Sequence, residues 1–148
     1  MKNEVDGRRE IASRNTAWAN IIARKLTHWG VTPNQISMMS VFFAMVGCLL
    51  LIGTVIYPGF NKYVAYILFI VCMQSRLLCN LFDGMVAIEG GKKSANGDLY
   101  NDMPDRFADA LFIIPVGYVA GGFGIELGWL AALLAVMTCL LYTSDAAD

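Results

Sequence analysis

Long apolar segments alternate with short polar ones along the chain, and the apolar lengths match the thickness of a lipid bilayer. Residues 38–57 form an uncharged run of 20 residues, and a helix of about 20 apolar residues crosses the hydrocarbon core. Three further uncharged runs follow it: 63–75, 110–125 and 127–144. Together the runs predict four membrane-spanning helices, at about residues 34–57, 62–86, 98–122 and 127–142.

The segment before the first span is apolar on one side only. Between residues 16 and 29, apolar side chains recur at helical spacing against basic ones: Trp18, Ile21, Ile22, Leu26 and Trp29 against Arg24, Lys25 and His28. This pattern predicts an amphipathic helix in the membrane interface, with a soluble helix packed on its own domain as the alternative. Gly30 ends this helix, and Thr32 and Pro33 suit the cap and first turn of the first span.

Composition and charge agree with a membrane protein. Of the 148 residues, 57% are hydrophobic and 16% charged, and the mean hydropathy is +0.54; soluble domains carry about a quarter charged residues. Most basic residues precede the first span or lie between the second and third, which places both segments in the cytoplasm. The predicted fold class is therefore all-α, a polytopic membrane helix bundle with an N-terminal interfacial amphipathic helix.

Polar side chains gather at the cytoplasmic ends of the second and third spans. Helical spacing puts them on one face of each span: Arg76, Asn80 and Asp83, then Asn101, Asp105 and Asp109. The link between the spans contains Gly90, Gly91 and Gly97, which let the backbone approach a ligand closely. Crowded carboxylates repel one another and are costly to bury unless a cation compensates. Hard oxygen ligands of this kind predict Mg²⁺ or Mn²⁺.

A structural role is the alternative for each of these residues. Acidic side chains at the start of a helix stabilise its dipole, or pair with arginines such as Arg76 and Arg106. His28 is interpreted as a headgroup contact. Lys92 and Lys93 are interpreted as solvated lysines that set the topology, with attraction of an anionic nucleotide as the alternative.

The spacing of the polar residues resembles the signature of the CDP-alcohol phosphatidyltransferase family, D-x2-D-G-x2-A-R-x8-G-x3-D-x3-D. Residues 80–87 read N-x2-D-G-x2-A, and Gly97, Asn101 and Asp105 follow at the spacing of the signature. The segment GVTPNQIS, residues 30–37, is also similar to the N-terminal segment of that family. Three positions depart from the signature: Asn80, Ile88 and Asn101 stand where it has aspartate, arginine and aspartate.

The resemblance implies roles for individual residues. The implied metal-site residues are Asn80, Asp83, Asn101 and Asp105, with Asp109 as a partial compensation for the two amides. Asp105 is also the implied catalytic general base. Gly84, Ala87 and Gly97 are the implied nucleotide-binding positions, and Arg76 and Arg106 are expected to contact phosphate or acceptor in place of the missing arginine.

The resemblance also implies an integral membrane phosphotransferase of phospholipid biosynthesis. Such an enzyme transfers a substituted phosphate from a CDP-linked donor, such as CDP-diacylglycerol, to an alcohol acceptor and releases CMP. We expect membrane lipids and a homodimer of the full-length chain as partners, no nucleic acid, and the bacterial inner membrane as location, with the active site facing the cytoplasm. A catalytically inactive membrane binding protein of the same fold is the alternative. A transporter or channel component is disfavoured, because the polar groups cluster at one membrane face.

The predicted domain organisation has three parts. Residues 1–15 form a polar N-terminal segment, residues 16–142 the membrane domain, and residues 143–148 a tail that we expect to be non-native. Members of the family typically have six membrane helices. Four predicted spans therefore also predict a chain that is truncated at its C-terminus.

Overall fold

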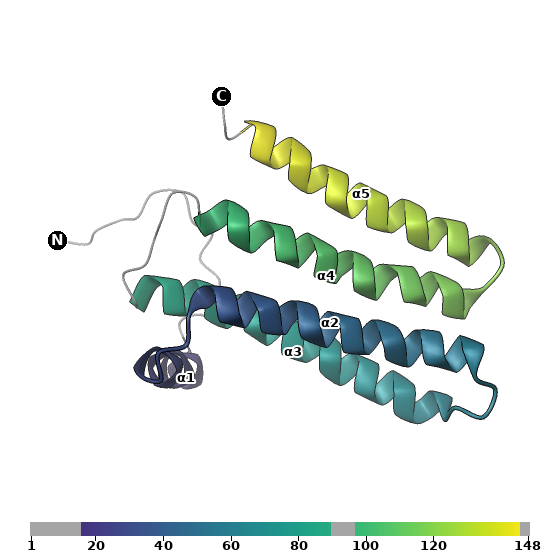
Figure 1. Cartoon of the computed structure of the whole chain (residues 1–148), viewed down its shortest axis with the longest axis horizontal. Helices are drawn as coiled ribbons and strands as arrows, with labels where there is room; N and C mark the ends of the chain where they lie inside the picture. Colours follow the sequence, from purple (N-terminus) through teal and green to yellow (C-terminus); the bar gives the residue numbers. More distant parts are fainter. Residues whose placement is uncertain (1–15, 90–96, 146–148) are drawn as a thin grey trace.

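The computed structural model describes residues 16–89 and 97–145, and every regular element in this part of the chain is an α-helix. The helices are α1 (Ala17–His28), α2 (Pro33–Ile56), α3 (Lys62–Glu89), α4 (Gly97–Ala120) and α5 (Phe123–Asp145). Helices α2 to α5 lie alongside one another as an elongated bundle, and α1 runs across one end of it (Figure 1). The predicted all-α membrane helix bundle is confirmed.

In the part of the chain that the structure describes, two helices are long and apolar enough to cross a membrane by length and composition, namely α2 and residues Lys62–Ile88 of α3. The apolar part of α5 that the structure describes, Phe123–Thr138, is shorter. Helix α5 also begins about four residues before its predicted start, because Gly121 and Gly122 alone make the turn from α4, with φ of +69° and +50°.

The connection from α1 to α2 follows the sequence prediction closely. Gly30 has a φ of +74° just after α1 ends. The Thr32 side chain accepts a hydrogen bond from the Gln35 N–H at 3.3 Å, and Gln35 Oε1 accepts one from the Thr32 N–H at 3.0 Å. This capping box, with Pro33 in the first turn, fixes where α2 begins.

The inward face of α2 is made mainly of small residues. Its buried positions recur every three or four residues: Ile36, Ser37, Ser40, Ala44, Gly47, Leu51 and Thr54. Helices α3 and α4 both pack against α2. Above Gly47 the rings of Phe69 from α3 and Phe112 from α4 meet edge to face, with centroids 5.4 Å apart. A Cβ atom on Gly47 would lie 2.8 Å from Phe112 Cε1, so the absence of a side chain there makes room for this contact.

Helix α1 is attached to the bundle through alanines, and its larger apolar side chains stay outside. Ala19 and Ala23 are fully buried against a cluster of Ile36, Phe82, Met85 and Val86. In contrast, Trp18, Ile21 and Trp29 are exposed. Exposed apolar side chains beside a membrane bundle suit the interface better than a helix packed on a soluble domain.

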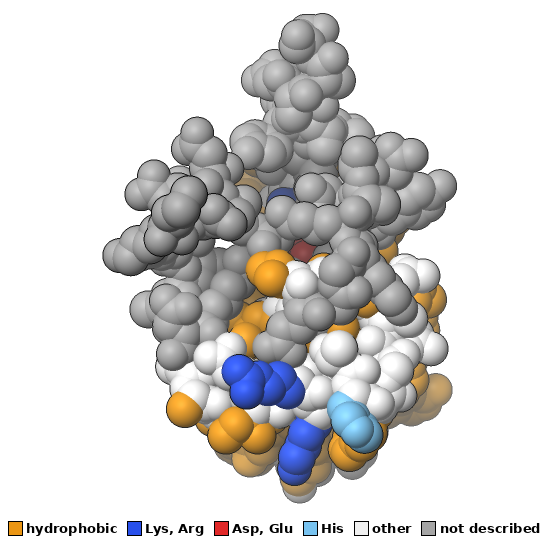
Figure 2. All heavy atoms as spheres, turned by 90° about the vertical axis from the view of Figure 1, so that its left-hand side faces the viewer, with side chains coloured by type: hydrophobic (Ala, Val, Ile, Leu, Met, Phe, Trp, Pro, Cys, Tyr) orange, Lys and Arg blue, Asp and Glu red, His pale blue; other side chains and the backbone are white. Residues whose placement is uncertain are grey.

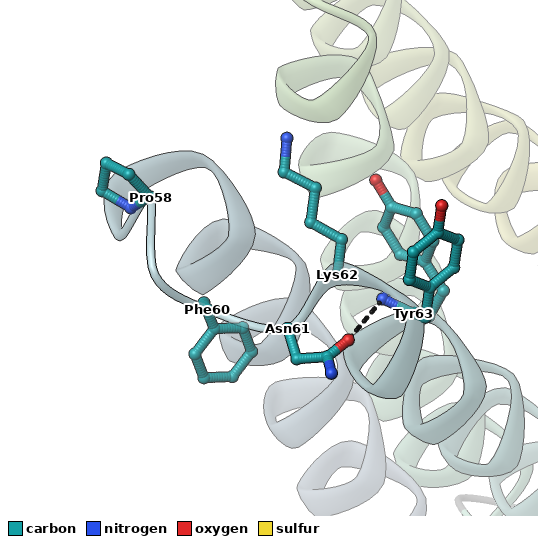
Figure 3. A pocket seen from close by; sticks show the side chains of 6 residues that line it. Pro58, Phe60, Asn61, Lys62 and Tyr63 are labelled. Carbon is teal, nitrogen blue, oxygen red and sulfur yellow. Dashed lines mark hydrogen bonds between the residues drawn. The ribbon is translucent and has the colours of Figure 1, made fainter.

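The two ends of the bundle differ in chemistry. Figure 2 shows the end that carries α1, where basic side chains and the single histidine of the chain lie together, and Arg24, Lys25 and His28 are exposed there. We call this the α1 end. At the far end, the turn from α2 to α3 forms an open hollow of about 500 Å³ (Figure 3). Its lining residues are Pro58, Phe60, Asn61, Lys62, Tyr63 and Tyr66, so it contains no carboxylate.

Helices α4 and α5 pack closely at Gly117. A Cβ atom on Gly117 would lie 2.6 Å from the Gly124 carbonyl oxygen and 3.0 Å from the Gly128 Cα atom. Both neighbours are backbone atoms, which cannot move aside without shifting the helix. Glycines of this kind let two membrane helices approach closely.

We predict that Gly117→Ala lowers the free energy of unfolding by about 1–3 kcal/mol, because the added methyl group overpacks a backbone contact. Gly53→Ala is the matched control, since its Cβ atom would lie 3.8 Å from Phe60 Cε1, at ordinary contact distance. Thermal unfolding of both variants in detergent measures the effect. Equal melting temperatures for the two variants would contradict the close packing of α4 on α5.

Candidate active site

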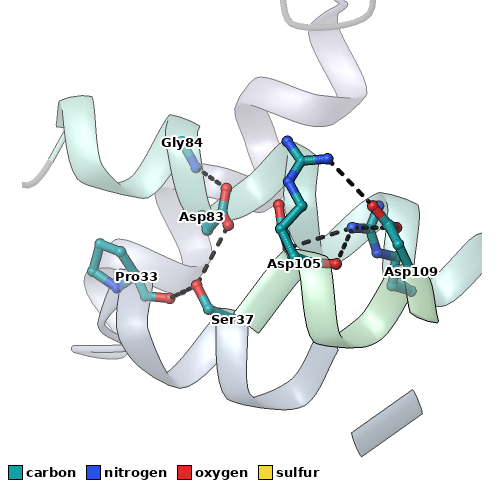
Figure 4. A network of polar contacts seen from close by, with 8 residues as sticks. Pro33, Ser37, Asp83, Gly84, Asp105 and Asp109 are labelled. Carbon is teal, nitrogen blue, oxygen red and sulfur yellow. Dashed lines mark hydrogen bonds and ion pairs between the residues drawn. The ribbon is translucent and has the colours of Figure 1, made fainter. Parts of the chain in front are cut away.

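Charged side chains from two helices are buried together near the α1 end of an otherwise apolar bundle (Figure 4). Arg76 and Asp83 of α3 are 7% and 3% exposed, and Asp105 of α4 is 9% exposed. Burying an isolated charge in an apolar environment is strongly unfavourable, so buried charges are paired or bound to ions. The contacts of these three residues therefore define the site.

Asp83 is held by its own helix and by α2. Its Oδ1 accepts a hydrogen bond from the Gly84 N–H, and its Oδ2 lies 3.4 Å from the hydroxyl of Ser37. The same hydroxyl lies 3.1 Å from the Pro33 carbonyl, so its proton is shared between two acceptors. Because the capping box sets the start of α2, it also sets the position of Ser37 beside Asp83.

Arg76 connects α3 to α4. Its Nη2 atom lies 2.9 Å from Asp109 Oδ1 and 3.5 Å from Asp105 Oδ1, and it donates to the Asp105 carbonyl at 3.2 Å. On the other side of Asp109, Oδ2 lies 3.5 Å from Arg106 Nη1. The Asp109 carboxylate thus forms ion pairs with the guanidinium groups of both Arg76 and Arg106. Charge-assisted contacts of this kind are stronger than neutral hydrogen bonds, and they hold α4 in register with α3.

Three of the predicted site residues form ion pairs with one another. Asp109, which was expected to bind metal, is engaged by both arginines, and this is the structural alternative that its spacing left open. Arg76 and Arg106, which were expected to contact phosphate or acceptor, both pair with Asp109, because a buried guanidinium needs a counter-charge. These contacts do not test the binding of metal or phosphate, so the predicted roles of the three residues stay predictions.

The remaining predicted residues divide between the described and the undescribed parts of the chain. Asn80, Gly84 and Ala87 lie on the same end of α3 as Asp83 and are partly buried. Gly97 and Asn101 belong to the first turns of α4, but the side chain of Asn101 lies outside the described residues, as do Gly90, Gly91, Lys92 and Lys93. Their predicted roles stay predictions.

Sequence reasoning missed the contribution of α2. Ser37 reaches Asp83, and Ser40, one turn further, is fully buried. A signal was present: the two serines are three residues apart at the start of an apolar span, in step with Ala44 and Gly47. Small residues at this spacing mark a helix face that packs closely on its neighbours. The site is therefore built by three helices rather than by the two that carry the acidic residues.

The oxygen donors suit a hard divalent cation, although the described residues contain few of them. Among residues 16–88 and 104–138, whose side chains the structure describes, no three acidic, histidine or cysteine side chains are grouped closely enough to hold a metal ion. However, Asp83 and Asp105 are buried carboxylates, and Asn80 adds an amide oxygen on the same helix end as Asp83. Carboxylate and amide oxygens are ligands of Mg²⁺ and Mn²⁺. The donor set fits such an ion with less negative charge than four aspartates would supply.

Two buried polar atoms support a polar ligand at this end. Ser40 Oγ and Arg76 Nε have no hydrogen-bond partner among the described residues. Buried polar atoms are almost always satisfied in folded proteins. A phosphate oxygen is a chemically suitable partner for an arginine N–H.

The family model for CDP-alcohol phosphatidyltransferase matches residues 30–146. The chain belongs to the CDP-alcohol phosphatidyltransferase family. No curated protein and no solved structure matches the chain. The matched segment begins at Gly30, after α1, and includes Ser37, Asp83 and Asp105. Membership identifies a transferase family of phospholipid synthesis whose members generally use divalent metal ions.

Proposed function

We propose that the protein is an integral membrane phosphotransferase that moves a substituted phosphate from a CDP-linked donor, such as CDP-diacylglycerol, to an alcohol and releases CMP. One observation carries this proposal. Asp83 and Asp105, which occupy two aspartate positions of the family signature, are both buried at the α1 end and are held there by polar contacts to neighbouring helices.

Within this proposal, Asn80, Asp83, Asn101 and Asp105 would hold Mg²⁺ or Mn²⁺. Bound there, the ion would neutralise charge on the diphosphate and on the departing CMP. Asp109 keeps the arginines in place, as its two ion pairs indicate. The small residues Gly84, Ala87 and Gly97 leave room for the nucleotide.

Asp105 acts as the general base. Its carboxylate accepts the proton of the attacking hydroxyl, whose oxygen forms a bond to the β-phosphorus as the bond from this phosphorus to the oxygen of CMP breaks. A base on a rigid helix and fixed by a second helix is well positioned for this step.

A lipid substrate is supported by an apolar hollow beside the site. This hollow of about 220 Å³ includes Leu26, Val31, Ile36, Met39, Cys79 and Phe82 in its lining. Ile36 and Phe82 directly precede Ser37 and Asp83 in the chain. An acyl chain in this hollow would stay in an apolar environment while its headgroup reaches the carboxylates.

The basic residues around the α1 end support a cytoplasmic orientation of the site. The bacterial inner membrane stays part of the proposal as a prediction. The anionic nucleotide would approach from the side on which Arg24 and Lys25 are exposed. A homodimer of the full-length chain stays part of the proposal as a prediction from the family resemblance.

The first prediction concerns the two carboxylates. Asp83→Asn and Asp105→Asn should each reduce CMP release by about 100-fold or more, because one removes a charged metal ligand and the other the base. The measurement is CMP formation from CDP-diacylglycerol and a panel of alcohols with Mg²⁺, using purified protein. Glu126→Gln, an exposed carboxylate at the far end, is the matched control and should retain full activity. Equal activity of all three variants would overturn the proposal.

A catalytically inactive binding protein of the same fold is the second candidate, favoured by the amides at positions 80 and 101. The double substitution Asn80→Asp/Asn101→Asp separates the two candidates, because it restores the acidic residues of the signature. If the natural chain is an enzyme, CMP release is already measurable, and the double variant mainly lowers the Mg²⁺ concentration needed for half-maximal activity. Activity that appears only in the double variant would instead show that the natural chain is inactive.

A further inference from the structure

The guanidinium of Arg76 lies beside the Asp105 carboxylate, which the proposed function assigns to the metal site. Its Nη2 contacts Asp105 Oδ1 at 3.5 Å and the Asp105 carbonyl at 3.2 Å. A divalent ion bound to the Asp105 carboxylate would lie close to the positively charged guanidinium of Arg76. Two cations a few ångströms apart in a buried site repel each other strongly. The arginine and the metal therefore compete for Asp105.

The arginine has a second anchor that lets it leave Asp105. Its shortest ion-pair distance, 2.9 Å, is to Asp109 Oδ1, one helical turn further along α4. Contact with Asp109 is enough to keep the guanidinium paired if its contact with Asp105 is lost. In addition, Nε is buried without a hydrogen-bond partner among the described residues. It is available to donate to an anionic oxygen, and phosphate is the anion that guanidinium binds best in such sites.

The small net charge of the site makes the competition between Arg76 and a divalent ion for Asp105 significant in this chain. Among the described residues, the site holds three carboxylates and two guanidinium groups: Asp83, Asp105 and Asp109 with Arg76 and Arg106. Among these five described side chains, one negative charge remains in excess. A divalent cation gains little from so weakly anionic a site unless the arginine is drawn off Asp105 or a second anion arrives.

We propose that Arg76 is a built-in counter-cation that makes metal binding depend on a diphosphate ligand. Without nucleotide, Arg76 neutralises Asp105 and weakens binding of the divalent ion. When a nucleoside diphosphate binds, its phosphate oxygens take over the guanidinium, Asp109 keeps hold of it, and Asp105 becomes available to the metal. Arg76 is thus a positioning residue. The inference rests on the proposed function, because it assumes that Asp105 is a metal ligand.

The test measures Mn²⁺ affinity by electron paramagnetic resonance, with and without cytidine diphosphate, on the full chain in detergent. In the natural protein, cytidine diphosphate should tighten Mn²⁺ binding by about tenfold, within the usual range of coupling between two ligands. The double variant Arg76→Gln/Asp109→Asn removes both charges of the ion pair. It should bind Mn²⁺ several-fold more tightly than the natural protein without nucleotide, and the tightening by nucleotide should largely disappear.

The matched control is Lys62→Gln/Glu126→Gln, which removes one cation and one anion at the far end of the bundle. It should show the affinities and the coupling of the natural protein. If the first double variant does not fold, Asp109→Asn serves instead. This variant leaves Arg76 on Asp105 alone, so Mn²⁺ binding without nucleotide should weaken several-fold and return to near the natural value with cytidine diphosphate.

The possible negative results distinguish failure of the proposed function from failure of the counter-cation role alone. If the natural protein binds Mn²⁺ neither alone nor with cytidine diphosphate, the proposed function fails, and the inference fails with it. Two other results would overturn only the counter-cation role of Arg76, provided that the natural protein binds Mn²⁺. In the first, cytidine diphosphate tightens Mn²⁺ binding to the Arg76→Gln/Asp109→Asn variant as much as to the natural protein. In the second, this variant binds Mn²⁺ more weakly than the natural protein both with and without the nucleotide. If Asp109→Asn weakens Mn²⁺ binding equally with and without cytidine diphosphate, Asp109 is itself a metal ligand. This result would also overturn the counter-cation role of Arg76.

Discussion

A charged guanidinium inside a membrane helix bundle has to find counter-charges, and the arrangement of α3 and α4 depends on this requirement. Arg76 sits in the middle of α3 and is almost completely buried. Its partners, Asp105 and Asp109, are both on α4. An unpaired arginine in the centre of a membrane helix costs about 3 kcal/mol on insertion scales. The ion pairs therefore fix which face of α4 turns toward α3.

Helix α2 makes this pairing geometrically possible. Its inward face carries Ser37, Ser40, Ala44 and Gly47, so α3 and α4 can both lie close to it. Side chains from α3 and α4 then meet over that face at two levels, through the Phe69–Phe112 rings and through Arg76 with its carboxylates. The same closeness brings Ser37 to Asp83. The polar site is thus a consequence of small residues on one helix and charges on the other two.

Much of this arrangement could be predicted from the sequence because it depends on local rules. Uncharged runs located the long helices, Gly30 and Thr32 marked a helix end and a helix start, and helical spacing put Arg76 on the same face as Asp83. Partner choice could not be predicted, because it depends on how the helices rotate against one another. Spacing alone allowed Asp109 to be either a metal ligand or an ion-pair partner, and only the packing shows that two arginines engage it. The contact of Ser37 with Asp83 could not be predicted either, because it also depends on how the helices rotate against one another.

We propose above all that Asp83 of α3 and Asp105 of α4 supply oxygen atoms to a single divalent cation at the α1 end. Anomalous diffraction from crystals of the protein with Mn²⁺ and cytidine diphosphate tests this claim most directly. The account predicts a manganese peak with carboxylate oxygens of both residues at about 2.0–2.3 Å and a phosphate oxygen in the same coordination shell. A manganese peak elsewhere, or none between these two side chains while the nucleotide is bound, would contradict it.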